Sequence, residues 1–266
     1  MTIDFYTMTS RFFKSDGLMR IGIVKHLNAR PLTYFFEHSN EFKTVADHPS
    51  ILVELLKNGE LDLALISSIE CERNKDVISY SKCVGVCARD LVRSVLFYKN
   101  KNDQNVPESI FTDSGSRASV ALLQCLFFLS FGKTPTVIPT LAIEIEAMME
   151  KGIGSHLLFG DHALLHKTTN DYEIVDLASW WNQLTDLYFC FAFWAYPKSK
   201  PVDDTLLIKS LESGLQHLDE IIQNESRLPT AIVDRYLRKE LHYVPEEKNL
   251  KGFELYIETC KKLNLI

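Results

Sequence analysis

The sequence has no excess of positive charge and no long apolar run. Lys and Arg total 29 and Asp and Glu total 35, so the 266-residue chain has a net charge of −6. An acidic chain does not attract nucleic acid or an anionic membrane through its overall field. A spanning helix needs about 18 consecutive apolar residues, and none are found; the N-terminus is also too polar for a signal peptide. We therefore expect a cytoplasmic protein without nucleic-acid or membrane partners.

The sequence also lacks the common metal, nucleotide and hydrolase motifs. Its six cysteines form no CxxC pair and no Cys/His cluster with zinc spacing, which favours buried free thiols. His162 and His166 are four residues apart but lack the glutamate of a HExxH motif. The P-loop, the GxGxxG turn and the GxSxG elbow are absent as well. These absences argue against a zinc site, a nucleotide fold and a serine hydrolase.

Strands and helices alternate in the first part of the chain. An apolar run at 20–24 predicts a buried strand, and residues 28–38 have helical spacing. A helix is expected from Pro49 to Gly59, because proline suits the first turn and glycine a position just beyond the last. The apolar run 61–66 then predicts a strand that ends in two serines. This order is typical of a βαβ unit with a parallel sheet.

A second α/β unit follows the polar stretch 99–105. It is expected to contain helices at 116–130 and 142–151 and strands at 136–138, 156–159 and 187–196, and residues 203–264 have an amphipathic helical pattern. We therefore predict two α/β lobes around a central cleft. The first lobe would comprise 19–98 with 195–266, the second 99–194, and 1–18 would be a tail.

Polar residues at strand ends and helix starts are the candidates for the cleft. Ligands of open α/β sheets bind beyond the carboxyl ends of the strands. The candidates here are Asn28, Ser67, Ser68, Arg93, Ser94, Ser116, Ser119, Gly160 and Asp161. Asn and Ser are also ordinary helix caps, and an Arg is often only a surface charge, so these residue types alone leave both interpretations open. The Ser/Gly cluster at 112–119 can bind a carboxylate through free N–H groups at a helix start.

Taken in order, the motifs resemble the chorismate dehydratase family of the futalosine route to menaquinone. The resemblance covers about residues 19 to 196 and rests on Leu27-Asn28 with Pro31-Leu32, on Leu61–Glu70, on Arg93-Ser94-Val95 and on Gly160-Asp161. It implies a periplasmic-binding-protein type II fold and conversion of chorismate to 3-enolpyruvylbenzoate and water, with no metal or organic cofactor.

The same resemblance implies roles for the candidate residues. Asn28 and Ser94 are expected nearest the chemistry, as catalytic residues. The substrate's carboxylates are expected to be bound by Ser67, Ser68, Ser116 and Ser119, with Arg93, Gly160 and Asp161 also in the binding site. The sequence departs from the family pattern at His26 and at Asp186-Leu187-Tyr188. Two alternatives share the fold: an enzyme of the same pathway that makes 1,4-dihydroxy-6-naphthoate, and a non-catalytic small-anion binding protein.

Overall fold

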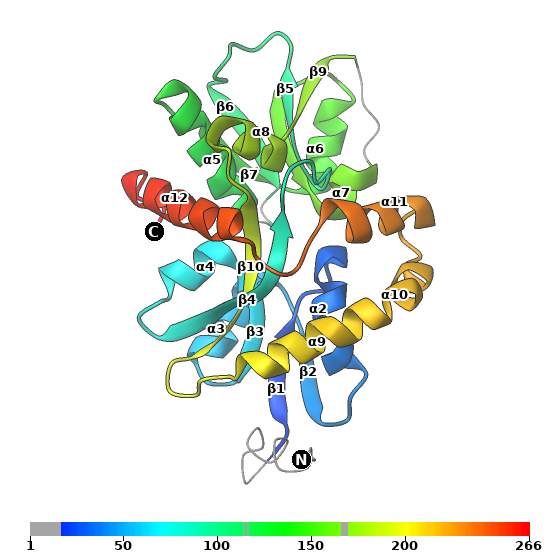
Figure 1. The fold of residues 1–266 in the computed structure, drawn as a ribbon. Coiled ribbons are helices and arrows are strands. Elements are labelled where there is room, and N and C mark those ends of the chain that lie inside the picture. The colour runs from blue at the N-terminus through cyan, green and yellow to red at the C-terminus, as the bar shows by residue number, and fades with distance from the viewer. Residues whose placement is uncertain (1–16, 114, 116, 166–169) are drawn as a thin grey trace.

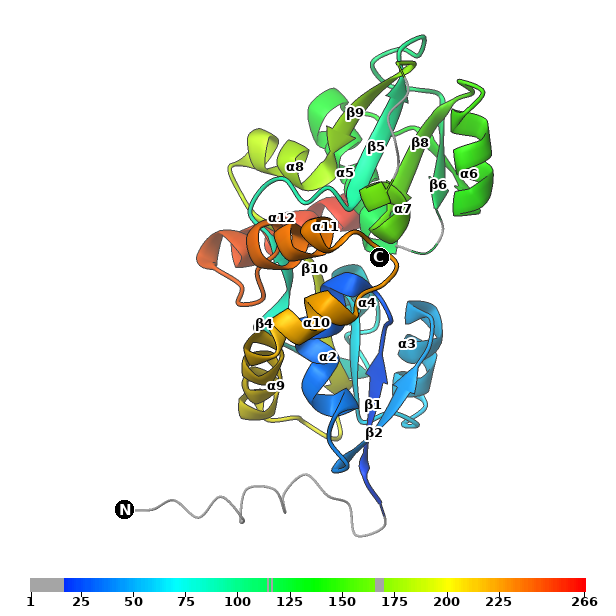
Figure 2. The ribbon, with the colours of Figure 1, turned by 90° about the vertical axis from the view of Figure 1, so that its right-hand side faces the viewer.

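The protein consists of two sheets of five strands each, placed end to end with helices around them (Figures 1 and 2). This computed structural model describes residues 17–113, 115, 117–165 and 170–266. The expected two-lobed α/β architecture is therefore confirmed. Within the described residues, no helix combines the length and apolar character needed to cross a membrane.

The first sheet has the strand order β2-β1-β3-β10-β4. Its strands are β1 (Met19–Ile23), β2 (Phe42–Ala46), β3 (Leu63–Ser67), β4 (Ile78–Ala88) and β10 (Phe189–Pro197). β1 runs parallel to β2 and β3, whereas β10 runs antiparallel to β3 and β4. Its connecting helices are the 3₁₀ turn η1 (Leu27–Ala29), α2 (Arg30–Glu37), α3 (Pro49–Lys57) and α4 (Ser68–Arg73). Gly59 adopts φ 71° just after α3, as the sequence predicted for a helix stop.

The second sheet has the order β7-β6-β8-β5-β9. Its strands are β5 (Val95–Asn100), β6 (Ser109–Asp113), β7 (Thr136–Thr140), β8 (Ser155–Phe159) and β9 (Tyr172–Asp176). Its helices are α5 (Arg117–Phe131), α6 (Ala142–Met149), α7 (Gly160–Leu165) and α8 (Leu177–Thr185). β6 runs parallel to β7 and β8, and β5 runs antiparallel to β8 and β9. The chain passes from the first lobe into the second at β5, and it returns to the first lobe at β10.

The chain changes sheets at other points than the expected lobe boundaries. It leaves the first sheet between β4 and β5 and returns between α8 and β10. β5 therefore belongs to the second sheet, and all of β10 belongs to the first, whereas the sequence placed the changes at 98 and 194. The polar stretch 99–105 contains the end of β5 and part of the connection from β5 to β6, within the second lobe. The strands of both lobes are short apolar runs, so the sequence pattern does not indicate which strand pairs with which.

The C-terminal region is helical, as expected, and contacts both lobes. It comprises α9 (Asp204–Gln216), α10 (Leu218–Asn224), α11 (Thr230–Arg235), the π-helical turn η2 (Tyr236–Glu240) and α12 (Glu247–Lys262). α9 packs along α2, and α12 lies at the junction against β10, α4 and α5 (Figure 1). The Tyr256 hydroxyl on α12 donates to the Ala118 carbonyl on α5 at 3.1 Å. This region therefore joins the lobes in addition to the two chain crossings.

The packing of α9 on α2 depends on Gly214. A Cβ atom at this position would lie 1.8 Å from the Pro31 carbonyl oxygen, which is backbone and cannot move away cheaply. On the same side, the Ser210 hydroxyl donates to the Leu32 carbonyl at 2.6 Å. These contacts fix the start of α2, which follows directly on the turn that carries Asn28.

We expect Gly214→Ala to destabilise the protein by about 1–3 kcal/mol, because overpacking outweighs the gain of about 1 kcal/mol in helix propensity. Urea denaturation measures the change. The matched control is Glu212→Ala, an exposed position of the same helix, which should change the free energy of unfolding by no more than about 0.5 kcal/mol. Equal stability of the two variants would contradict the close contact.

Candidate active site

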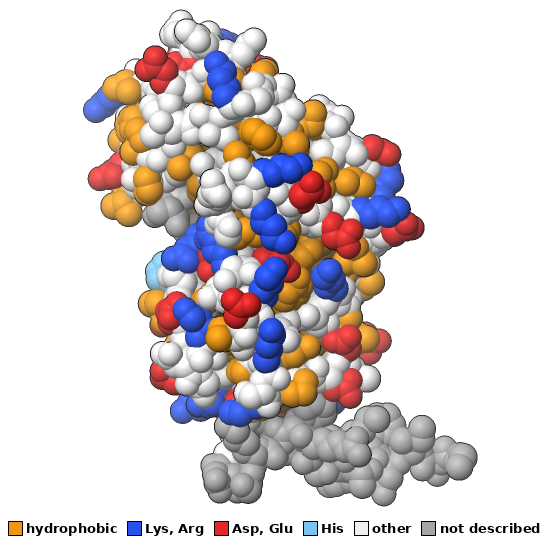
Figure 3. Space-filling view, turned by 90° about the vertical axis from the view of Figure 1, so that its left-hand side faces the viewer, with side chains coloured by type: hydrophobic (Ala, Val, Ile, Leu, Met, Phe, Trp, Pro, Cys, Tyr) orange, Lys and Arg blue, Asp and Glu red, His pale blue; other side chains and the backbone are white. Residues whose placement is uncertain are grey.

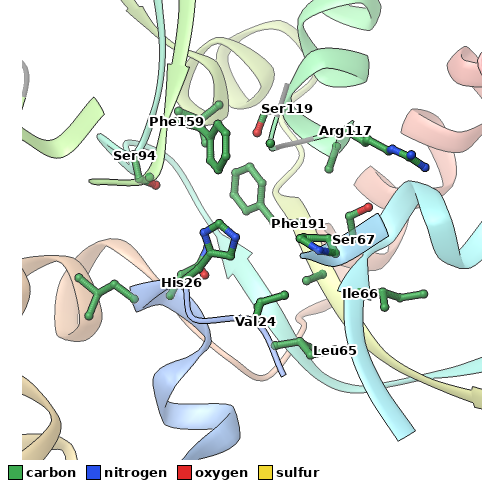
Figure 4. A pocket seen from close by; sticks show the side chains of 18 of the residues that line it. Val24, His26, Leu65, Ile66, Ser67, Ser94, Arg117, Ser119, Phe159 and Phe191 are labelled. Atoms are coloured by element: carbon green, nitrogen blue, oxygen red, sulfur yellow. The ribbon is translucent and has the colours of Figure 1, made fainter. Parts of the chain in front are cut away.

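A cavity of about 350 Å³ lies between the two lobes (Figure 4). Both lobes, the hinge strand β10 and the C-terminal region contribute to its lining. Apolar side chains make up much of the wall: Val24, Leu27, Leu65, Ile66, Val92, Val95, Leu164, Phe159, Phe191 and Leu241. A few polar groups at strand ends and helix starts face this apolar surface. Such a pocket suits a small ligand with an apolar body and a few polar substituents.

The cavity brings together six of the predicted site residues. They are Asn28, Ser67, Ser94, Ser119, Gly160 and Asp161. They come from η1, the end of β3, the residue before β5, the first turn of α5 and the start of α7. Ser116 lies outside the described residues. Strand ends and helix starts of two lobes thus converge, as the sequence predicted from their local polarity.

Ser68, which the sequence also placed in the binding site, does not line the cavity. Ser68 is fully buried at the start of α4, and its Oγ has no hydrogen-bond partner among the described residues. Its neighbour Ser67 does line the cavity. The chain passes from β3 into α4 between these two residues, and only Ser67 contributes to the cavity lining.

Arg93, the predicted anion-binding arginine, also lies outside the cavity lining. Its guanidinium forms an ion pair with Glu240, which in turn pairs with Arg235 at 2.7 Å. The Arg93 backbone adopts φ 55°, and its N–H donates to the Asp176 carboxylate at 2.6 Å. Arg93 therefore joins the crossing between β4 and β5 to the C-terminal region.

The structure adds a tyrosine that the sequence analysis did not identify. Tyr236 lines the cavity from η2, and its hydroxyl donates to Ser94 Oγ at 2.8 Å. Burial raises the pKa of this phenol, and Asn28 lines the same cavity. In the sequence, Tyr236 forms part of an amphipathic helical pattern and carries no separate signal. Only the fold brings it to the two residues expected nearest the chemistry.

Gly160 has a structural role beside these residues. It begins α7 with φ 63°, and its N–H donates to the Ser94 carbonyl at 2.7 Å. A residue with a side chain would be strained in this left-handed conformation. Gly160 therefore holds the backbone of Ser94 in place at the cavity wall.

The carboxylates of the cavity are compensated by arginines. Glu70 pairs with Arg73 at 2.6 Å and with Arg117 of the opposite lobe at 3.2 Å. Asp161 pairs with Arg227 at 2.8 Å. Neither carboxylate therefore opposes an anionic ligand with its full charge. The molecular surface likewise carries acidic and basic side chains side by side on the face shown in Figure 3.

His26 projects into the cavity and faces Phe159, with ring centroids 5.9 Å apart (Figure 4). Burial lowers the pKa of His26 below its usual value of 6.5, and the nearby Asp161 partly opposes that shift. The imidazole is therefore neutral near pH 7. Within the described part of the chain, no group of three or more His, Cys, Asp or Glu side chains is arranged to hold a metal ion.

Two relatives with assigned names match nearly the whole chain. The chorismate dehydratase of Thermus thermophilus is 27% identical over 260 residues, which cover 88% of this chain and 93% of that protein. The chorismate dehydratase of Campylobacter jejuni is 26% identical over 258 residues, which cover 96% and 99%.

Solved structures support the expected fold. A protein from Archaeoglobus fulgidus superposes with a TM-score of 0.73 at 15% identity, covering 95% of this chain and all of that one. The alkanesulfonate-binding protein of Xanthomonas axonopodis superposes with a TM-score of 0.64 at 15% identity, covering 95% and 94%. The periplasmic aliphatic sulphonate binding protein of Escherichia coli gives 0.64 at 14% identity, covering 95% and 89%. At these identities the likeness concerns the fold alone, and it confirms the periplasmic-binding-protein architecture.

The family assignment rests on a match to a family model. This match extends further along the chain than the motifs of the resemblance, which end at about residue 196. The model of the menaquinone biosynthesis family matches residues 19–262, from β1 to the last turn of α12. The match includes the strands of both lobes and the C-terminal region that contributes Tyr236. The chain therefore belongs to the menaquinone biosynthesis family.

Proposed function

We propose that this protein is a chorismate dehydratase, which converts chorismate to 3-enolpyruvylbenzoate and water in menaquinone biosynthesis. The relatives named chorismate dehydratase support this substrate and reaction. The observation that carries the proposal is the cavity that Asn28 and Ser94 line from separate segments of the chain, with the Tyr236 hydroxyl hydrogen-bonded to Ser94. The reaction makes the enzyme a carbon–oxygen lyase.

The chemistry requires a proton to leave carbon and a hydroxide to leave its neighbour. Chorismate carries a ring carboxylate, an enolpyruvyl carboxylate, and adjacent C3–H and C4–OH groups. The C3–H bond breaks, the C4–O bond breaks, and the ring becomes aromatic. Negative charge that develops at C3 spreads through the diene into the ring carboxylate. Hydrogen-bond donors aimed at that carboxylate and at the leaving oxygen therefore lower the barrier.

The polar groups of the cavity can supply those donors. Ser67 Oγ is buried and has no protein partner among the described residues, so its proton is available to a ligand. Ser119 lies in the first turn of the 15-residue helix α5, where the helix dipole favours an anion. We assign the two carboxylates to these positions, with Arg117 beside them. Asn28 and Ser94 then face the reacting carbons.

The proton from C3 goes to the substrate's own enolpyruvyl carboxylate and from there to the hydroxide that leaves C4, which gives water and restores the carboxylate. The carboxylates that line the cavity, Glu70 and Asp161, are both held in ion pairs with arginine. An internal carboxylate that the pocket orients correctly gains an effective molarity equivalent to about 7–11 kcal/mol. In this mechanism the protein supplies orientation and donors, and the substrate supplies the base.

Incubation of the purified protein with chorismate tests the proposal. We expect formation of an aromatic product, followed by ultraviolet absorbance and identified by mass. Asn28→Ala and Ser94→Ala should each lower kcat by about 10²–10³-fold, because each removes a donor to developing charge. The matched control is Ser68→Ala, an adjacent buried serine outside the cavity, which should retain normal turnover.

Two outcomes would reject the proposal. Chorismate binding without product would indicate a non-catalytic receptor. Neither binding nor turnover would point to another substrate, such as that of the dihydroxynaphthoate-forming enzyme. Full activity of Asn28→Ala would reject the role of that residue alone.

The neutral state of His26 leads to a second prediction, that ligand binding is accompanied by proton uptake. Burial holds its pKa below 6.5 in the free protein, and a bound dianion favours the protonated imidazole. Binding therefore raises the pKa of His26, so protons are taken up and affinity increases as pH falls from about 7 through 6.5 and below. Calorimetry at pH 6 in buffers of different ionisation enthalpy measures the uptake.

His26→Gln should reduce that proton uptake and flatten the pH dependence of the affinity. His242→Gln is the matched control, because burial also lowers the pKa of His242 but its side chain lies outside the cavity lining. If both variants take up as many protons as the unsubstituted protein, the position assigned to the dianion is wrong.

A further inference from the structure

We infer that Tyr236 is a positioning residue of this active site, which directs the Ser94 hydroxyl proton toward the substrate. The inference rests on the proposed function and extends it to the C-terminal region. Its basis is the 2.8 Å hydrogen bond from the Tyr236 hydroxyl to Ser94 Oγ, in a part of the cavity where both side chains are almost completely buried.

The direction of the hydrogen bonds determines what Ser94 can do. A serine hydroxyl has one proton to donate and lone pairs that accept. When Tyr236 donates to Ser94 Oγ, the Ser94 proton must point elsewhere. Among the described residues no second side-chain partner of Ser94 is found, and the residue lines the cavity. The remaining acceptor is therefore a ligand in the cavity.

The Tyr236–Ser94 pair borders the space that Asn28 also lines. Two successive hydrogen bonds that point the same way, from Tyr236 to Ser94 and from Ser94 to the ligand, polarise each other and strengthen the second donor. The Ser94 proton is therefore directed to the place where charge develops in the proposed reaction.

The local fold holds Tyr236 and Ser94 together at a second point. Arg93 precedes Ser94, Glu240 is the last residue of the turn that begins with Tyr236, and these two form an ion pair. Arg235, which precedes Tyr236, pairs with the same carboxylate. The two segments are thus fixed by a hydrogen bond at one position and by ion pairs at the next. Single π-helical turns occur frequently at functional sites.

The nearby Tyr243 shows that a buried tyrosine hydroxyl in this region need not form a hydrogen bond like that of Tyr236. Tyr243 is also buried, but its hydroxyl has no hydrogen-bond partner among the described residues, and its side chain does not line the cavity. Burial raises the pKa of both phenols, so both remain protonated donors near neutral pH. Tyr243 is therefore the matched control for the loss of one buried hydroxyl.

The test compares Tyr236→Phe with Tyr243→Phe in the chorismate assay. We expect Tyr236→Phe to lower kcat by about tenfold, the effect of one net hydrogen bond, and to change KM less than about threefold. Tyr243→Phe should keep both constants. In a Ser94→Ala background, Tyr236→Phe should cause no further loss, because Tyr236 acts through Ser94.

A second variant gives a readout that a packing role would not change. Tyr236→3,5-difluorotyrosine keeps the shape of the side chain but makes the phenol more acidic, so the alkaline limb of the kcat–pH profile should move to lower pH. It also serves if Tyr236→Phe does not fold. An active enzyme in which Tyr236→Phe matches Tyr243→Phe, or in which its effect is unchanged by Ser94→Ala, overturns the inference alone. A wild-type protein without turnover overturns the proposed function as well.

Discussion

The backbone hydrogen bonds between β4 and residues 242–243 fix the C-terminal region on the hinge, and the rest of the site depends on them. Cys87 exchanges hydrogen bonds with His242 at 2.9 and 3.0 Å, and the Gly85 N–H donates to the Tyr243 carbonyl at 2.9 Å. The two segments therefore form an isolated antiparallel bridge. Because η2 ends only two residues before His242, this pairing carries the turn to the cavity wall. Without it, neither lobe would contain a residue in the position of Tyr236.

The site could be predicted from the sequence where its signal is local. Asn28, Ser67 and Gly160 each follow an apolar strand, and the order of such segments resembles one family. The adjacent Ser68 could not be distinguished from Ser67, because the alternation of side chains depends on where the strand ends. Arg93 has the chemistry of an anion ligand, but its partner Glu240 is nearly 150 residues away in the chain. Tyr236 had no local signal at all.

The fold was predictable to a similar extent. Strands with continuous apolar runs, such as β3 and β8, were identified, whereas the edge strands β2 and β9 were not, since much of each lies exposed or half-buried and gives little alternation. The lobe boundaries were misplaced because strand partners depend on contacts between distant residues. The antiparallel positions of β5 and β10 follow from the same long-range pairing. The helix stop at Gly59 was predicted correctly, whereas strands with a weak local pattern and contacts between distant residues were not.

The position of α12 has a consequence for how the molecule unfolds. Gly252 packs against the Tyr188 carbonyl at the entrance to β10, and Tyr256 and Cys260 reach α5 of the second lobe. The buried face of one helix is thus shared between two sheets. Loss of structure in either lobe removes part of the surface that stabilises the other. We therefore expect the two lobes to unfold together, although the chain is organised as two lobes.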